Sequence, residues 1–124
     1  MTLDSQTGAI ENANKAAADF YGYTIGRLES MKIQEINTLT PEETEKEMQA
    51  AASEKRNYFI FKHRLAGGDI RTVEVYSCPH IQGEKTILFS TIYDITARTQ
   101  LEEKNRMMTD AFLFVLACAV SGIL

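Results

Sequence analysis

An alternation of apolar and polar residues begins after Asn57 and constrains the fold more than any other feature of the sequence. Phe59, Phe61 and His63 share one side of a strand, and the residues between them fall on the other side. Residues 66–69, with the sequence Ala-Gly-Gly-Asp, favour a reverse turn, so the chain should return as a hairpin. The pattern therefore predicts an antiparallel sheet in the second half of the chain.

The hairpin and one more strand complete this prediction. The second arm of the hairpin begins at residue 70 and is expected to stop at Pro79, because proline cannot donate a hydrogen bond to a neighbouring strand. A turn at residues 82–84 then leads into a strand over residues 86–93. We expect three consecutive antiparallel strands.

Capping motifs predict helices in the first half of the chain. Asn14 and Thr24 are candidate N-caps of two short helices. Residues 40–43, Thr-Pro-Glu-Glu, form a capping box at the start of a helix that should end near residue 53. With an exit helix from residue 97, the order of elements predicts an α+β fold with helices on one face of the sheet.

Length and composition limit the classes of function. A chain of 124 residues fits one domain, and a net charge of -4 without a long basic run gives no reason to expect a nucleic-acid partner. Cys78 and Cys118 lie far apart and form no metal-binding or disulfide motif. With no signal-peptide pattern at the N-terminus, these features favour a cytoplasmic protein.

The last part of the sequence, residues 111–124, is almost wholly apolar. It is shorter than the roughly 20 residues that a membrane-spanning helix requires, so a membrane partner is not expected. Three interpretations stay open: a dimer seam, the beginning of a membrane segment, or a tail outside the selected fold. The last would fit a truncated or frameshifted fragment.

Several short motifs occur in an order and spacing that unrelated α+β domains have no reason to share. They are residues 4–8 with Ile10, the pair Ala13-Asn14, residues 20–23, residues 64–68, residues 73–75 with Pro79, and residues 94–96. Together they resemble the PAS family over roughly residues 4–108.

The resemblance implies a five-stranded antiparallel sheet with short helices on one face, a cavity between them, and a C-terminal helix that carries a signal to an output domain. Only Thr2 and Leu3 remain of the strand that usually precedes the first matching motif, so the first strand is expected to be truncated. We therefore divide the chain into a sensor domain (residues 1–96), a signalling helix (97–110) and an apolar tail of unclear role (111–124).

Eight residues are expected to border the cavity and any ligand or cofactor in it. They are Tyr21, Tyr23, Met31, Ile36, Asn37, Phe59, Phe61 and His63. Of these, Asn37, Tyr23 and His63 could supply polar anchors. The alternative for the whole set is a filled core, and for His63 a structural histidine whose hydrogen bonds are satisfied.

The resemblance also bears on the cofactor, whose identity stays open. Haem-binding PAS domains typically take an axial histidine from the helices, and residues 9–57 contain none. The light-sensing branch of the family needs a cysteine that residues 30–34 do not supply. Neither haem nor covalently bound flavin is expected, while a non-covalent ligand remains open.

No residue is predicted to be catalytic, and no metal site is expected. Residues 67–69, Gly-Gly-Asp, resemble the active hairpin of diguanylate cyclases, but Ile70 follows where an acidic residue is needed. Glycine also suits the positive φ angles of a reverse turn. The turn interpretation is therefore favoured, and we expect no enzymatic activity.

Residues after the last strand are predicted to transmit the signal. We expect Asp94, Ile95 and Thr96 to form the junction, with Asp94 paired to Arg98 and the Thr96 hydroxyl capping the exit helix.

Leu101 and Met108 lie seven residues apart in the exit helix, which is typical of a coiled-coil seam. So short a seam needs additional apolar surface, so we predict a homodimer that also uses the exposed sheet face.

The sequence thus predicts a cytoplasmic input module that senses a small molecule, redox state or partner. Its exit helix would relay the result to an output domain of the histidine kinase or diguanylate cyclase type. The alternative is a ligand-free module for dimerisation or protein interaction.

Overall fold

The computed structural model describes the backbone of residues 1–121 and the side chains of residues 1–109. The chain divides into two units, Met1–Asp94 and a second unit that begins at Ile95. The first unit is an α+β structure, and the second is a helix. Each is described separately below.

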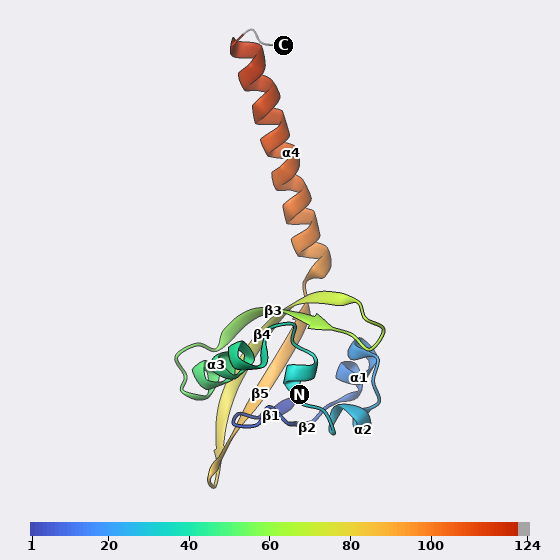
Figure 1. Cartoon of the computed structure of the whole chain (residues 1–124), viewed down its shortest axis with the longest axis vertical. Coiled ribbons are helices and arrows are strands. Elements are labelled where there is room, and N and C mark those ends of the chain that lie inside the picture. Colours follow the sequence, from blue (N-terminus) through green and yellow to red (C-terminus); the bar gives the residue numbers. More distant parts are fainter. Residues whose placement is uncertain (122–124) are drawn as a thin grey trace. The chain divides into compact units, whose positions relative to one another are not determined.

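A single antiparallel sheet of five strands forms the centre of the first unit, as predicted (Figure 1). The strands are β1 (Thr2–Asp4), β2 (Ile10–Asn12), β3 (Tyr58–Arg64), β4 (Ile70–Gln82) and β5 (Lys85–Asp94). Their order across the sheet is β2-β1-β5-β4-β3. The short β1 thus lies in the middle of the sheet, between β2 and the long β5.

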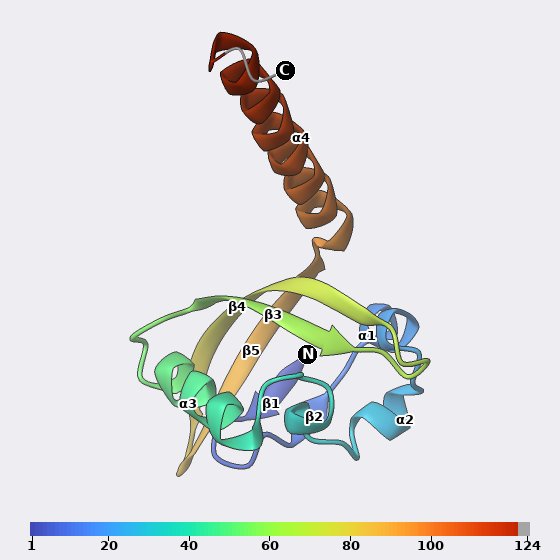
Figure 2. The same cartoon turned by 45° about the horizontal axis from the view of Figure 1, so that its top comes forward.

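Helices cover one face of the sheet (Figures 1 and 2). They are α1 (Lys15–Tyr21), α2 (Ile25–Leu28), the 3-10 helix η1 (Ile33–Glu35) and α3 (Pro41–Ala52). The predicted caps are confirmed: the Asn14 side chain accepts from the Ala17 N–H, and the Thr24 hydroxyl accepts from the Arg27 N–H. The capping box before α3 is also formed.

The predicted stop at Pro79 is wrong, because β4 continues through it to Gln82 and pairs Pro79 with Leu88 of β5. The physical reason lies on the other edge of β4. Ser77 donates its N–H away from β5, to the carbonyl of Asn57, and Pro79 has the same orientation two residues later. By then β3 no longer lies alongside, so the missing N–H of proline leaves no partner unpaired.

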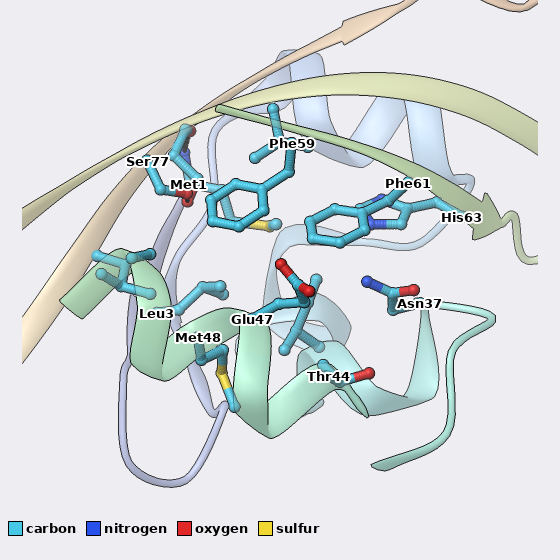
Figure 3. A pocket seen from close by; sticks show the side chains of 15 residues that line it. Met1, Leu3, Asn37, Thr44, Glu47, Met48, Phe59, Phe61, His63 and Ser77 are labelled. Atoms are coloured by element: carbon cyan, nitrogen blue, oxygen red, sulfur yellow. Dashed lines mark hydrogen bonds between the residues drawn. The ribbon is translucent and has the colours of Figure 1, made fainter. Parts of the chain in front are cut away.

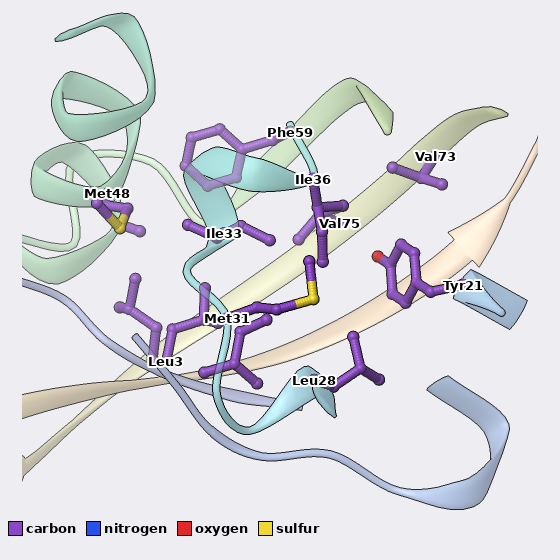
Figure 4. Packing of buried hydrophobic residues seen from close by; sticks show 13 residues of the cluster. Leu3, Tyr21, Leu28, Met31, Ile33, Ile36, Met48, Phe59, Val73 and Val75 are labelled. Carbon is purple, nitrogen blue, oxygen red and sulfur yellow. The ribbon is translucent and has the colours of Figure 1, made fainter. Parts of the chain in front are cut away.

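The core lies between the helices and the inner face of the sheet (Figure 4). Leu28, Ile36 and Val73 are completely buried in it. Val73 and Val75 point inward from β4 because side chains alternate along a strand, while Met48 and Ala51 point inward from α3. This packing fixes α3 against the sheet and places it opposite the aromatic residues of β3.

The second unit contains α4 (Thr96–Ser121). Among the residues that the structure describes, no helix combines the length and the apolar character that crossing a membrane requires. The side chains of residues 111–124, on which the three interpretations of the apolar tail depend, lie outside the described residues.

Candidate functional site

A small, partly enclosed cavity lies between β3 and α3 (Figure 3). Its lining residues come from six elements, from the loop after η1 and from the N-terminal residue. They are Met1, Leu3, Ile33, Asn37, Thr44, Glu47, Met48, Ala51, Phe59, Phe61, His63, Val75, Ser77, Leu88 and Ser90. The cavity volume is about 40 Å³. That is room for roughly three water molecules, far below the ~300–1,000 Å³ of a pocket for a drug-sized ligand.

Three aromatic rings of β3 line one wall of the cavity. The rings of Phe59 and Phe61 are 5.3 Å apart and nearly parallel, and those of Phe61 and His63 are 5.9 Å apart and also nearly parallel. The alternation of β3 puts all three on the inner face. The result is a rigid wall that is apolar except at the His63 end.

His63 combines deep burial with an incomplete set of hydrogen bonds. Its side chain is 2% exposed, and Nδ1 lies 2.8 Å from the hydroxyl of Tyr21 on α1. Nε2 is buried and has no hydrogen-bond partner among the described residues. The alternative of a fully satisfied structural histidine therefore holds for one ring nitrogen only.

Burial also determines the charge of this pair. Desolvation lowers the pKa of His63 to about 4, so the imidazole is neutral at pH 7. The same effect raises the pKa of the Tyr21 hydroxyl, which stays protonated. The polar end of the cavity is thus uncharged.

Several other polar groups around the cavity have partners. The hydroxyls of Ser77 and Ser90 lie 2.9 Å apart across β4 and β5. The Thr44 hydroxyl donates to the carbonyl of Thr40 within α3. Glu47 lines the cavity and pairs with Arg56. These contacts leave Nε2 of His63 as the buried lining atom that requires an explanation.

The structure brings together half of the eight residues that the sequence proposed for the cavity. Asn37, Phe59, Phe61 and His63 line it. Asn37 is placed there by a short antiparallel bridge to His63. Tyr21 reaches the site only through His63.

The other three proposed residues do not line the cavity. Met31 and Ile36 are buried in the core, and Tyr23 is partly buried against it.

The α3 side of the cavity was not predicted from the sequence. Thr44 and Met48 lie four residues apart on α3, as do Glu47 and Ala51, so the helical period could have pointed to them. Because side chains alternate along a strand, Ser77 of β4 points inward like Val75. Its hydroxyl is paired there with that of Ser90 on β5, a partner that the sequence does not reveal.

The proposed junction residues lie at the end of β5 and the start of α4. Asp94 accepts hydrogen bonds from Nε and Nη2 of Arg71, at 3.1 and 2.6 Å. Arg71 was not predicted as a partner of Asp94, and the predicted pairing of Asp94 with Arg98 stays a prediction. Thr96 is the first residue of α4, and the carbonyl of Ile95 accepts the N–H of Thr99. The helix therefore begins one residue earlier than expected, with Ile95 before it.

Comparison with known proteins identifies the family. A model of the PAS fold matches residues 2–100, which include all five strands and the start of α4. The chain belongs to the PAS family. This PAS domain is 35% identical over 105 residues to the diguanylate cyclase DgcM of Escherichia coli K12, covering 81% of the chain. It spans about a quarter of the length of that relative.

Solved structures show the same fold. The PAS domain of a protein from Desulfitobacterium hafniense superimposes with a TM-score of 0.70 at 22% identity, covering 76% of this chain and 89% of its own. A sensory box histidine kinase/response regulator from Burkholderia thailandensis gives a TM-score of 0.66 at 17% identity, covering 90% and 86%. The family match supports a sensory input module.

Proposed function

We propose that this PAS domain is the input module of a larger signalling protein and that α4 passes the state of its cavity to an output domain of the kinase or cyclase type. The match to the PAS fold over residues 2–100 carries this proposal, because it includes the sensory unit together with the first residues of the exit helix. The relatives named as kinases and a cyclase supply the class of output.

A short path on the inner face of the sheet connects the cavity to the junction. His63 of β3 lies opposite Arg71 in the register of β4, and Arg71 binds Asp94. Asp94 is the last residue of β5, and the chain enters α4 two residues later. A change at His63 can therefore alter the environment of the residue that precedes the helix. The Arg71–Asp94 pair is partly exposed and should contribute only about 0 to 1 kcal/mol, which suits a switch between states of similar free energy.

We expect Asp94→Asn to change signalling output more than stability. In a fusion of this chain to a cyclase or kinase domain, a shift of about 1 kcal/mol in the switching equilibrium would change output about fivefold. The melting temperature should change little, because the pair is partly exposed. Thr96→Ala tests the other end of the junction in the same assay.

Asp69→Asn is the matched control, because Asp69 lies in the exposed hairpin turn between β3 and β4. It should retain both the output and the stability of the unmodified fusion. Output that follows thermal stability alone across the variants, or that stays constant while the fold is intact, would show that the junction is only structural.

Exposed aromatic residues favour a second element of the proposal, self-association. Tyr58, Tyr76 and Tyr93 adjoin one another on the outer face of the sheet, with ring centroids 5.0 and 6.1 Å apart. On α4, Leu101 is 59% exposed and Met108 is 62% exposed. Apolar surface of this kind is typical of an interface, and we propose that it joins two copies of the chain.

We expect light scattering to give the mass of a dimer for the unmodified chain, and Leu101→Glu to weaken the dimer by placing a charge in the seam. Lys104→Glu, also on α4, serves as a charge control at a polar position. A chain that stays monomeric at high concentration would refute the dimer.

A further inference from the structure

The direction of the hydrogen bond between Tyr21 and His63 follows from what surrounds it. The Tyr21 side chain is 1% exposed, so its hydroxyl proton has no access to bulk water. Among the described residues, the hydroxyl has one hydrogen-bond partner, Nδ1 of His63. A buried hydroxyl proton requires an acceptor, so Tyr21 donates and Nδ1 accepts. A neutral imidazole carries one proton, which must then be on Nε2.

Nε2–H is therefore a buried donor on a side chain that lines the cavity. It has no acceptor among the described side chains and backbone groups. Leaving such a donor unpaired costs free energy, whereas a molecule with an acceptor atom would remove that cost by binding. The geometry thus selects a ligand that presents an acceptor to His63.

The charged groups around the cavity also limit the charge of the acceptor group that a ligand can present. Among the described residues, no lysine or arginine side chain lines the cavity. Glu47, which does line it, is paired with Arg56, and the N-terminal ammonium of Met1 donates to the carbonyl of Ser90. His63 is neutral, so it offers no positive charge to an anion. Both of these cations, Arg56 and the ammonium of Met1, already have partners, so a buried carboxylate ligand would find no free counter-charge, which is unfavourable. The acceptor should belong to an uncharged group.

We propose that this cavity binds a small, uncharged molecule whose carbonyl oxygen accepts the hydrogen bond of His63 Nε2–H and whose apolar part lies against Phe59 and Phe61. A volume of about 40 Å³, the bulk of roughly three waters, admits a molecule of about three to four non-hydrogen atoms. This inference rests on the proposed sensory function and names the chemical class of its ligand.

Three probes of similar size test the class on the full chain: acetone, isobutene and acetate. In titrations followed by NMR, acetone should bind about tenfold more tightly than isobutene, which corresponds to one additional hydrogen bond. The Nε2 resonance of His63 should shift with acetone alone. Equal affinity for the ketone and the hydrocarbon, or tightest binding of acetate, would overturn the proposal.

Replacing both members of the pair, His63→Phe with Tyr21→Phe, keeps the aromatic volume and removes the donor. This variant should bind acetone and isobutene equally. His80→Phe is the control, because His80 is the other histidine of the chain and does not line the cavity, and it should keep the tenfold preference.

If the double variant does not fold, the position of the ring proton of His63 in the unmodified protein tests the proposal. NMR correlations from the ring nitrogens should show the proton on Nε2 at pH 7, and a proton on Nδ1 would overturn the proposal. Failure of the proposed ligand class and failure of the proposed signalling relay give different results. A co-purifying ligand without a carbonyl group would refute this class but leave the sensory function, while unaltered output from Asp94→Asn would refute the relay but leave the ligand class.

Discussion

Acidification from pH 6.5 to pH 4 should remove about 3 kcal/mol of unfolding free energy through His63 alone. Burial lowers the pKa of this histidine from 6.5 to about 4 in the folded protein. As the pH falls below 6.5, the unfolded chain binds a proton that the folded chain does not accept, so unfolding becomes more favourable. The contribution is fully present above pH 6.5, declines across this interval, and changes no further below about pH 4.

Urea unfolding at a series of pH values measures this effect, with His63→Phe as the comparison. The variant leaves the hydroxyl of Tyr21 without its acceptor, which lowers stability by a constant amount at every pH. The carboxyl groups titrate in both proteins, so the difference between the two curves isolates the histidine. A difference that is flat between pH 6.5 and pH 4 would show that His63 is not held neutral by burial.

Phe61→Trp should displace a ligand that co-purifies with the protein. The larger indole must enter a cavity of only about 40 Å³, and overpacking of about 1–3 kcal/mol would lower affinity about tenfold or more. Absorbance spectra and mass spectrometry of material released from the native protein measure the occupancy. The unmodified protein should carry one small molecule per chain.

Ile60→Trp is the matched control, because Ile60 is the neighbouring residue of β3 and faces outward. It should retain the ligand at the level of the unmodified protein. Equal occupancy in both tryptophan variants would place the ligand elsewhere, and a protein that dimerises but never carries a ligand would favour the interaction module instead.

Local features of the sequence determined most of the elements. Asn14 and Thr24 cap their helices with groups three residues away, and the capping box at Thr40 spans the same distance. Such hydrogen bonds close within one helical turn, so their partners are fixed by spacing. The alternation through β3 likewise fixed which side chains face the core.

The site was determined by partners that lie far apart in the chain. Tyr21 and His63 are separated by 42 positions, and Arg71 and Asp94 by 23. No spacing rule selects such pairs, because only the packing of α1, β3, β4 and β5 brings them within hydrogen-bond distance. The continuation of β4 past Pro79 also depended on the tertiary structure. Proline is tolerated at this position because β3 ends before it and needs no N–H from it.

The sequence by itself therefore determined the helix starts, the hairpin, the inward-facing residues of β3 and the resemblance to the PAS family. Only the tertiary structure decided that β1 lies between β2 and β5 and which lining residues face Phe59 and Phe61. It also decided that one nitrogen of His63 has no partner within the described part of the chain. The physical reason is that helix caps and strand alternation depend on neighbours in sequence, whereas cavities and unsatisfied groups depend on how separate elements fill space.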